Sequence, residues 1–473
     1  MKRFIILAVV ILLTAALLGG CAEKKWSPGQ VYKIKDEPEP MDLGGETIVV
    51  VDSVSTRWNR QELGTPYNDA WHFVLDNVEQ KWNCKIDFRH ITEFKVVEEA
   101  TPEILAGDKF CDILCTTQWR FGHLIGADLM MDLNELSTDW DNIWWNQNIR
   151  KIATLNGKTY AANGSFNFDA VYTWLVQFNV EIWDELQLPD PYQLVEDGKW
   201  TMDLLMDYSK RAMRDEDGNG IVDTPDDRWG MVAWDGDFAR ALYMSSGNHY
   251  FAEHDGVLRM DMANQRSYDF VGKMQKYYKE DKSVAPNFFR GEPNIADRQN
   301  QMFLDGKSLF YSSYLGRHMM REMEADWGVL PMPKYDEDQE KYMSTVDWNG
   351  SVMGVTKTQT EPDKLGRLLD AIGFYAMDLE KIYWPDYEET YWRHDEDARI
   401  VAEYVCHSGQ YDMALLMANA NGDIFGRPMG IVFDAMFGNT KDFSSEVERY
   451  KEAIDYALDK YFEDLEHENR LGD

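Results

Sequence analysis

The feature that most constrains the fold is an alternation of strand-like and helix-like segments that begins at residue 46. Residues 46–51 form a run rich in valine and isoleucine, which is typical of a strand buried on both faces. Helix-like and strand-like segments then alternate in residues 67–82, 85–89, 94–106 and 111–115. This β-α-β-α-β order predicts an α/β fold in which helices cover a parallel sheet.

The rest of the chain continues the alternation less regularly. Further strands are expected at residues 172–179, 230–234, 327–331 and 351–355. Further helices are expected at residues 201–213, 268–280, 295–303, 365–377 and 444–462. A length of 473 residues allows two domains, and no segment has the composition of a single linker between them. We therefore expect the chain to cross between two lobes more than once.

The N-terminus has the pattern of a secretory signal that ends in a lipid-attachment site. A positive start precedes an apolar run over residues 4–18, which is shorter than the ~20 residues of a membrane-spanning helix. The run ends in Leu18-Gly19-Gly20-Cys21, in which small residues precede a cysteine as in a lipobox. The pattern predicts a signal peptide over residues 1–20 and a diacylglycerol on Cys21. The alternative is an ordinary signal peptide beside a chance cysteine.

A polar segment separates this cysteine from the first strand. Residues 21–45 are rich in Lys, Glu, Asp and Pro, which predicts a solvated, flexible tether. Two acyl chains suffice for stable anchoring. The expected location is therefore the extracellular face of the cell membrane, with the protein held there by its lipid.

The charge balance excludes one class of partner. The chain has 48 Lys and Arg against 83 Asp and Glu, a formal net charge of -35. Such a surface repels nucleic acid and anionic lipid, so no nucleic-acid partner is expected. The charge also argues mildly against a polyanionic ligand, although a local basic pocket could override it.

The cysteines beyond Cys21 show no spacing typical of a zinc site. Their even number permits disulfides outside the cell. However, Cys111 and Cys115 lie in one strand-like run, which separates them by roughly 13 Å, too far for a bond between them. Buried free thiols are the expectation for these two residues and for Cys84 and Cys406.

Several motifs occur along the chain in a characteristic order. The longest is Trp-Gly-Val-Leu-Pro-Met-Pro-Lys-Tyr-Asp at residues 327–336, followed by Gln339, Lys341 and Tyr342. Shorter ones lie at residues 106–114, 126–136, 156–160, 178–179, 195–201, 393–397 and 411–412. Together they resemble the motifs of extracellular solute-binding proteins of family 1, the carbohydrate-type substrate-binding lipoproteins of ABC transporters.

The resemblance implies a type II two-lobed clamp like that of periplasmic binding proteins. Each lobe is expected to be a mostly parallel sheet flanked by helices, with several crossovers between the lobes. The N-terminal lobe is expected to combine residues 46–160 with about 287–345, and the C-terminal lobe residues 161–286 with about 346–473.

The resemblance also implies a function. A monomer of this family captures its carbohydrate, here expected to be an oligosaccharide, in a cleft between the lobes and delivers it to the permease subunits of an ABC importer. The implied protein is not an enzyme.

One acidic loop has the ligand spacing of a calcium-binding EF-hand loop. Oxygen-bearing side chains occupy positions 1, 3, 5, 9 and 12, and a glycine, Gly220, occupies position 6. The expected calcium ligands are Asp215, Asp217, Asn219, the carbonyl of Ile221, Asp223 and Asp226. The alternative is an acidic turn, since Asp-Gly-Asn-Gly favours turns in any case. Similar loops in the resembled family hold a structural ion, so the expected role of Ca²⁺ is structural.

Aromatic residues supply the candidate sugar-binding site, because the apolar C–H face of a sugar stacks on aromatic rings while its hydroxyls need polar partners. Ligands of open α/β sheets bind beyond the carboxyl ends of the strands, where Trp58, Trp119 and Trp234 are expected. The candidate ligand-binding residues are Arg57, Trp58, Trp119, Asn163, Trp234, Asp235, Tyr311, Trp348 and Asn349. The alternative for each aromatic residue is packing within or between the lobes.

Two other functions stay open. Abundant carboxylates leave room for a secreted glycoside hydrolase, although the chain has no Gly-x-Ser-x-Gly, phosphate-loop or His-Glu-x-x-His motif. A surface lipoprotein that binds glycans without transport is the second alternative. Turnover of an oligosaccharide would identify the first, and the absence of neighbouring permease genes would favour the second.

Overall fold

The computed structural model describes residues 37–470, apart from residues 54–65, 168, 256, 294, 317–322, 385–391, 407, 421–423 and 438–441. The expected signal peptide, Cys21 and most of the expected tether therefore lie outside the described residues. Within the described part, no helix is both long and apolar enough to span a bilayer.

The first lobe is built on a four-stranded sheet of order β13-β3-β1-β2. Its strands are β1 (Glu46–Asp52), β2 (Cys84–His90), β3 (Ile113–Thr117) and β13 (Ser351–Gly354). β1 runs parallel to β2 and β3, and β13 runs antiparallel to β3. This part confirms the expected β-α-β-α-β order and its mostly parallel sheet.

Helices cover both faces of this sheet, as the apolar run at residues 46–51 requires. Ile48 and Val50 pack into a core with α2 (Pro66–Trp82) and α12 (Pro362–Ala376). Val51 points to the other face, into a core shared with α3 (Val96–Leu105) and α4 (Gln118–Gly126).

The second lobe is built on a four-stranded sheet of order β11-β6-β10-β7. Its strands are β6 (Trp174–Asn179), β7 (Trp229–Ala233), β10 (Ser308–Tyr314) and β11 (Trp327–Pro331). β10 runs parallel to β7, but β6 lies between β10 and β11 and runs antiparallel to both. The sheet is therefore mixed, and the expectation of a mostly parallel sheet is wrong for this lobe.

The later residues are divided between the lobes differently from the expectation. β10 and β11 were expected in the N-terminal lobe but pair within the second sheet. β13 was expected in the C-terminal lobe but pairs with β3, and α12 packs on α2. A local strand pattern reports burial but does not name the partner strand, so the sequence could not assign these strands to a sheet.

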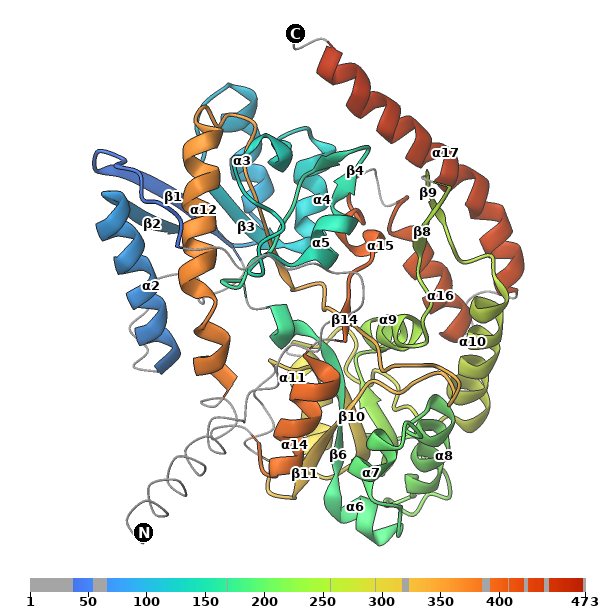
Figure 1. Ribbon diagram of the computed structural model, residues 1–473. Helices are drawn as coiled ribbons and strands as arrows, with labels where there is room; N and C mark the ends of the chain where they lie inside the picture. The colour runs from blue at the N-terminus through green and yellow to red at the C-terminus, as the bar shows by residue number, and fades with distance from the viewer. Residues whose placement is uncertain are drawn as a thin grey trace, which may run out of the picture.

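The chain crosses between the lobes several times, which confirms the two-lobed clamp (Figure 1). Thr173, just before β6, forms a bridge with Val346, in the segment that leads to β13, so the first two crossings lie side by side. The adjacent β12 (Ser344–Thr345) pairs with β14 (Gly409–Gln410), which adds a third crossing segment.

The last helices of the chain, from residue 413 onward, connect the two lobes. The short helix α15 (Met413–Leu416) leads into a close backbone contact with α4, where a Cβ on Gly122 would lie 2.4 Å from the carbonyl oxygen of Leu416. α16 (Arg427–Phe437) then packs on α9 (Asp235–Ser245) of the second lobe. α17 (Phe443–Arg470) packs on α16 and on β9 (Val257–Met260).

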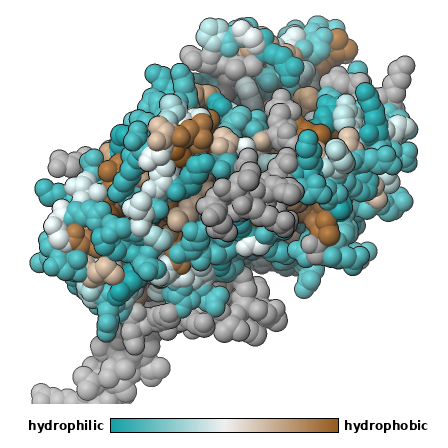
Figure 2. Space-filling model, turned by 90° about the horizontal axis from the view of Figure 1, so that it is seen from above, coloured by the Kyte–Doolittle hydropathy of each residue, from teal (hydrophilic) through white to brown (hydrophobic). Residues whose placement is uncertain are grey.

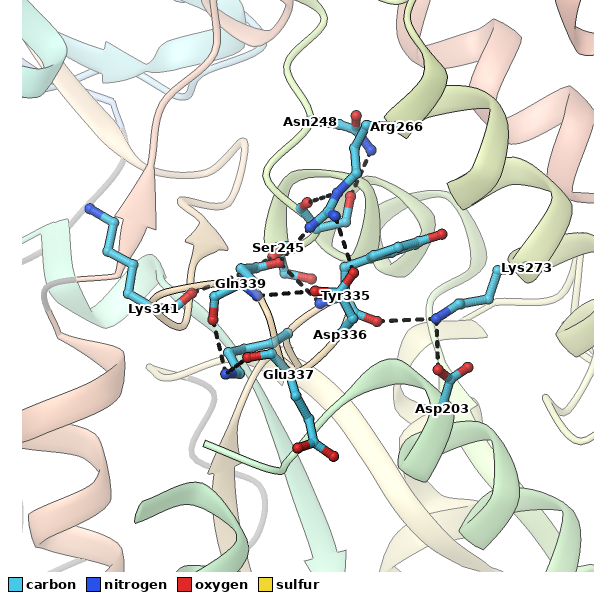
Figure 3. A network of polar contacts seen from close by, with 12 residues as sticks. Asp203, Ser245, Asn248, Arg266, Lys273, Tyr335, Asp336, Glu337, Gln339 and Lys341 are labelled. Atoms are coloured by element: carbon cyan, nitrogen blue, oxygen red, sulfur yellow. Dashed lines mark hydrogen bonds and ion pairs between the residues drawn. The ribbon is translucent and has the colours of Figure 1, made fainter. Parts of the chain in front are cut away.

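The motif at residues 327–342 has a structural role in the second lobe (Figure 3). Gln339 donates to the carbonyl oxygen of Ser245 at the end of α9 at 2.9 Å and accepts from Arg266 at 3.2 Å. The ring of Tyr335 lies 4.1 Å from the Arg266 guanidinium and 4.2 Å from the Lys273 ammonium. Arg266 and Lys273 both belong to α10 (Gln265–Gln275), so the loop after β11 fixes α9 against α10.

The surface is mostly hydrophilic on the face seen in Figure 2, where hydrophobic side chains form small, separate patches. This agrees with the acidic composition. Cys84, Cys111 and Cys115 are free thiols and are buried, whereas Cys406 is only half-buried. The expectation for the Cys111 and Cys115 thiols is therefore confirmed.

Candidate functional site

The candidate sugar-binding residues fall into groups that the structure places differently. Arg57 and Trp58 lie outside the described residues. Trp119 lies in the first turn of α4, directly after β3 of the first lobe. Trp234 and Asp235 start α9, directly after β7 of the second lobe. Trp348 and Asn349 lie between β12 and β13, in a segment that returns from the second lobe to the first.

Trp119 and Trp348 meet where the two lobes join. Their rings are perpendicular, with centroids 5.4 Å apart. The indole nitrogen of Trp348 lies 3.4 Å from Oδ2 of Asp237, in the first turn of α9. A row of two half-buried aromatic rings and a carboxylate therefore runs from the first lobe to the second.

Asp347 is the polar centre of this junction. Its buried carboxylate accepts from the indole nitrogen of Trp174 at 2.7 Å and lies 3.4 Å from the Arg240 guanidinium. Its other oxygen accepts from the amide nitrogen of Asn349 at 2.7 Å. The backbone carbonyl of Asp347 accepts from Gln118 of α4 at 2.6 Å. A carboxylate is buried at acceptable cost only when it is paired and hydrogen-bonded in this way.

Arg240 links the two carboxylates of the junction. It lies on α9, is 6% exposed, and contacts Asp237 at 3.2 Å as well as Asp347 at 3.4 Å. The sequence did not single out this residue. The one available signal was its spacing three residues after Asp237, which places the two side chains on the same face of a helix, but no helix was expected at residues 235–245, where the structure has α9.

Asp235 sits at the start of the same helix and is 9% exposed. Burial raises the pKa of Asp235 to about 6, against the opposing effect of the Arg290 guanidinium at 3.9 Å. Among the described residues, its Oδ1 has no hydrogen-bond partner. A carboxyl group with a spare oxygen in this position is able to bind a ligand hydroxyl.

Two candidates lie deeper than expected. Asn163 is fully buried, and its amide nitrogen lies 3.4 Å from the hydroxyl of Tyr411. Tyr311 is also buried: its ring stacks on Phe303 and its hydroxyl donates to Asn300 at 2.5 Å. Both partners of Tyr311 belong to α11 (Ile295–Leu304), so the structure places Tyr311 in the core of the second lobe.

The acidic loop at residues 215–227 brings carboxylates together, but with one change in the expected set. Oxygens of Asp215, Asp217 and Asp227 lie within 4.8 Å of one another. Asp227 follows the expected ligand Asp226, whose residue is exposed and whose backbone carbonyl accepts from Lys307. The expected ligands Asn219 and Asp223 are hydrogen-bonded to each other at 3.1 Å, and Ile221 is exposed.

Backbone amides already bind much of the carboxylate of Asp227. They come from Glu216, Asp223 and Thr224, each at 3.0 Å. Burial would raise the pKa of Asp227, but these hydrogen bonds outweigh it and hold the pKa well below its usual range. Asp215 accepts from the backbone nitrogens of Gly218 and Gly220, both at 2.7 Å, and both glycines adopt a positive φ.

The loop fits a calcium ion in its donor chemistry. Asp215, Asp217 and Asp227 provide carboxylate oxygens, the donors that hard Ca²⁺ prefers, and Asn219 and Ile221 could add amide and carbonyl oxygens. Asp227 is partly committed to backbone donors, so it would contribute less to a bound ion than Asp215 and Asp217.

The fold has many counterparts among solved structures. The maltose-binding protein MalE from Listeria monocytogenes, in complex with maltose, is 15% identical with a TM-score of 0.58, covering 88% of this chain and 98% of that chain. A cyclo/maltodextrin-binding protein complexed with maltotetraose is 15% identical with a TM-score of 0.56, covering 91% and 98%. This chain has the fold of these binding proteins.

A third counterpart is the cyclic α-maltosyl-1,6-maltose binding protein from Arthrobacter globiformis. It is 10% identical with a TM-score of 0.59, and the match covers 88% of this chain and 99% of that chain. No protein-family model and no curated protein matches the chain. At identities this low, the structural match establishes the fold alone. The chemistry of the site must be argued from this chain's own residues.

Proposed function

We propose that this protein captures a carbohydrate between its two lobes, as the extracellular binding component of an ABC importer. The observation that carries the proposal is the contact of Trp119 with Trp348 and of Trp348 with Asp237, which joins aromatic rings of one lobe to polar groups of the other. Sugars need both kinds of surface, because their C–H faces stack on rings and their hydroxyls bind carboxylates, amides and arginine.

The fold supports this choice of function. The solved counterparts are named as binding proteins and were determined with maltose or maltotetraose bound. A ligand that contacts both lobes binds the closed arrangement more tightly than the open one. The difference between the two binding free energies is the amount by which the ligand stabilises the closed arrangement. Asp347 contacts Gln118 of the first lobe and Arg240 of the second, so it is well placed to sense such a closure.

Anchoring and delivery form a further part of the proposal. The pattern at residues 18–21 supports a lipid on Cys21, with the following polar residues as its tether. A tether raises the effective concentration of the binding protein near a permease in the same membrane. Membrane-bound permease subunits are therefore the proposed protein partners.

Calcium is proposed as a structural ligand of the loop at residues 215–227. Asp215 and Asp217 lie in the carboxylate cluster, and repulsion within it would be relieved by a cation. The loop follows α8 (Met202–Ala212) and precedes β7, so an ion there would stabilise the second lobe. We assign it no part in ligand uptake.

A thermal-shift screen of the domain over residues 37–473 against a glycan panel tests the proposed function, because a ligand that binds the folded state raises the melting temperature. We expect at least one class of oligosaccharide to raise it, by RT ln(1 + [L]/Kd) in free energy. Released reducing ends would instead identify a glycoside hydrolase. Failure of every glycan to shift the melting temperature would contradict the proposal.

A further inference from the structure

An exposed aromatic ring extends the junction between the lobes outward. Phe94 lies between β2 and α3, just past the carboxyl end of β2, and is 67% exposed. Single exposed hydrophobic residues are common on protein surfaces and need no explanation by themselves. Phe94 differs because its ring is edge-on to Trp119, with centroids 6.4 Å apart.

Phe94 therefore continues a row of rings that begins between the lobes. Trp348 lies at the inner end, Trp119 in the middle and Phe94 at the outer end, with neighbouring centroids 5.4 Å and 6.4 Å apart. Each spacing is comparable with the repeat of one sugar unit along an oligosaccharide. Exposure increases along the row, from half-buried Trp119 and Trp348 to exposed Phe94.

A cation lies over the outer part of the row. The Arg120 guanidinium is 3.7 Å from the centroid of Trp119 and 4.9 Å from that of Phe94. Its Nε is buried and has no hydrogen-bond partner among the described residues. An arginine that stacks on rings keeps its N–H groups in the plane of the guanidinium, where they can donate to hydroxyl oxygens.

The local charge at the outer end of the row, around Phe94 and Arg120, favours a neutral or weakly charged ligand. Glu93 precedes Phe94; burial raises the pKa of its carboxyl group, and a side-chain hydrogen bond with Thr117 and the charge of the nearby Arg120 guanidinium oppose this effect. The two opposite charges compensate each other, so the outer end of the row has no excess of positive charge to select a polyanion.

We propose that Phe94, Trp119 and Arg120 form an outer subsite that binds one sugar unit of an oligosaccharide whose inner units lie at Trp348. This inference rests on the proposed function and deepens it, because it assigns the ligand a length greater than two units. Phe94 is then a specificity-determining residue: it contacts long ligands and leaves a disaccharide untouched.

Calorimetric titration of Phe94→Ala tests the subsite. The probes are four series from disaccharide to hexasaccharide, built from α-1,4-glucose, β-1,4-glucose, β-1,4-mannose and β-1,4-xylose. In the series that the wild type binds, affinity should rise with the length of the ligand. Phe94→Ala should raise the Kd for the longer members about tenfold. Its affinity for the disaccharide should not change. Phe94→Trp should restore the dependence on length.

The matched control is Phe73→Ala, which removes an equally exposed ring, 68% exposed, from α2 of the same lobe. This variant should bind every length as the wild type does. If affinity does not rise with length, or if Phe94→Ala binds long and short ligands like the wild type, the subsite is overturned while the proposed function stands. Binding of no glycan by the wild type would overturn both. If Phe94 contacts the permease instead, the Phe94→Ala variant would bind every ligand normally and cells that carry it would take the ligand up more slowly. That result would also overturn the subsite.

Discussion

Arg240 of α9 and Asp347 of the returning segment form an ion pair at 3.4 Å whose side chains are only 7% and 2% exposed. The pair joins the second lobe to a strand connection that leads back into the first sheet. Arg240 also contacts Asp237 at 3.2 Å, and Asp237 lies 3.4 Å from the indole nitrogen of Trp348, so the candidate site depends on this arginine.

Arg240→Ala should therefore destabilise the protein strongly. The substitution leaves the Asp347 carboxylate buried with one charged partner fewer, and breaking a buried pair in this way costs about 3 kcal/mol or more. Urea unfolding followed by tryptophan fluorescence measures the change. Lys381→Ala is the control, because its pair with Asp378 is exposed and should contribute less than about 1 kcal/mol. Equal, small effects of both substitutions would contradict the assigned role of Arg240.

Asp235 should make stability depend on pH between about 4 and 6. Its folded pKa, about 6, lies above the usual value of about 3.9, so the folded state binds the proton more tightly than the unfolded state does. Stability from this group is therefore fully present below pH 4 and is lost as pH rises towards 6. Buried Asp397 has a pKa raised to about 6 as well and adds a contribution of the same sign.

Asp235→Asn should remove part of this slope and leave the part that belongs to Asp397. The measurement is urea unfolding of the wild type and of Asp235→Asn at several values of pH from 4 to 7. The variant should gain stability relative to the wild type as pH rises across this range. A constant difference between the two proteins would show that the Asp235 carboxyl is not perturbed by burial.

Removal of calcium should lower the melting temperature if the loop at residues 215–227 holds the ion. We expect a decrease of a few degrees in excess chelator, because a ligand of the folded state stabilises it by mass action. Asp217→Asn should abolish the difference between calcium and chelator. Asp207→Asn, an exposed carboxylate on α8 outside the loop, should keep it. Identical melting of the wild type in both conditions would reduce the loop to an acidic turn.

Cys21→Ser should release the protein from the membrane. The substitution removes the thiol that would take the diacylglycerol, and a single apolar signal does not anchor a mature protein once cleaved. Fractionation of cells into membrane and medium, read by immunoblot, measures this. Cys406→Ser should stay in the membrane fraction. Full membrane retention of Cys21→Ser would contradict lipid anchoring.

Much of the first lobe could be predicted because its signals are local. The run at residues 46–51 reports burial on both faces, and the helical spacing at residues 67–82 reports α2. Trp119 could be placed near the junction because it follows the carboxyl end of a strand. The strand partners of β10, β11 and β13 could not, because pairing depends on segments that are far away in the sequence.

The errors at the site have the same physical origin. Tyr311 lies on a strand whose alternate residues face opposite sides, and the sequence does not say which side is covered by α11. Asp226 and Asp227 are adjacent acids, and only the path of the loop shows that Asp227 turns inward. The roles of Phe94 and Arg240 depend on contacts with residues in other segments of the chain, Trp119 for Phe94 and Asp347 for Arg240, which the sequence alone does not reveal.

The central claim is that the paired rings of Trp119 and Trp348 bind the carbohydrate, and calorimetric titration of their alanine variants tests it most directly. The titrant is the glycan that most raises the melting temperature of the wild type, and Phe73→Ala is the control. Each tryptophan variant should lose about 2 kcal/mol of binding free energy, roughly thirtyfold in Kd, while it stays folded by circular dichroism. Normal affinity in both folded tryptophan variants would contradict the account.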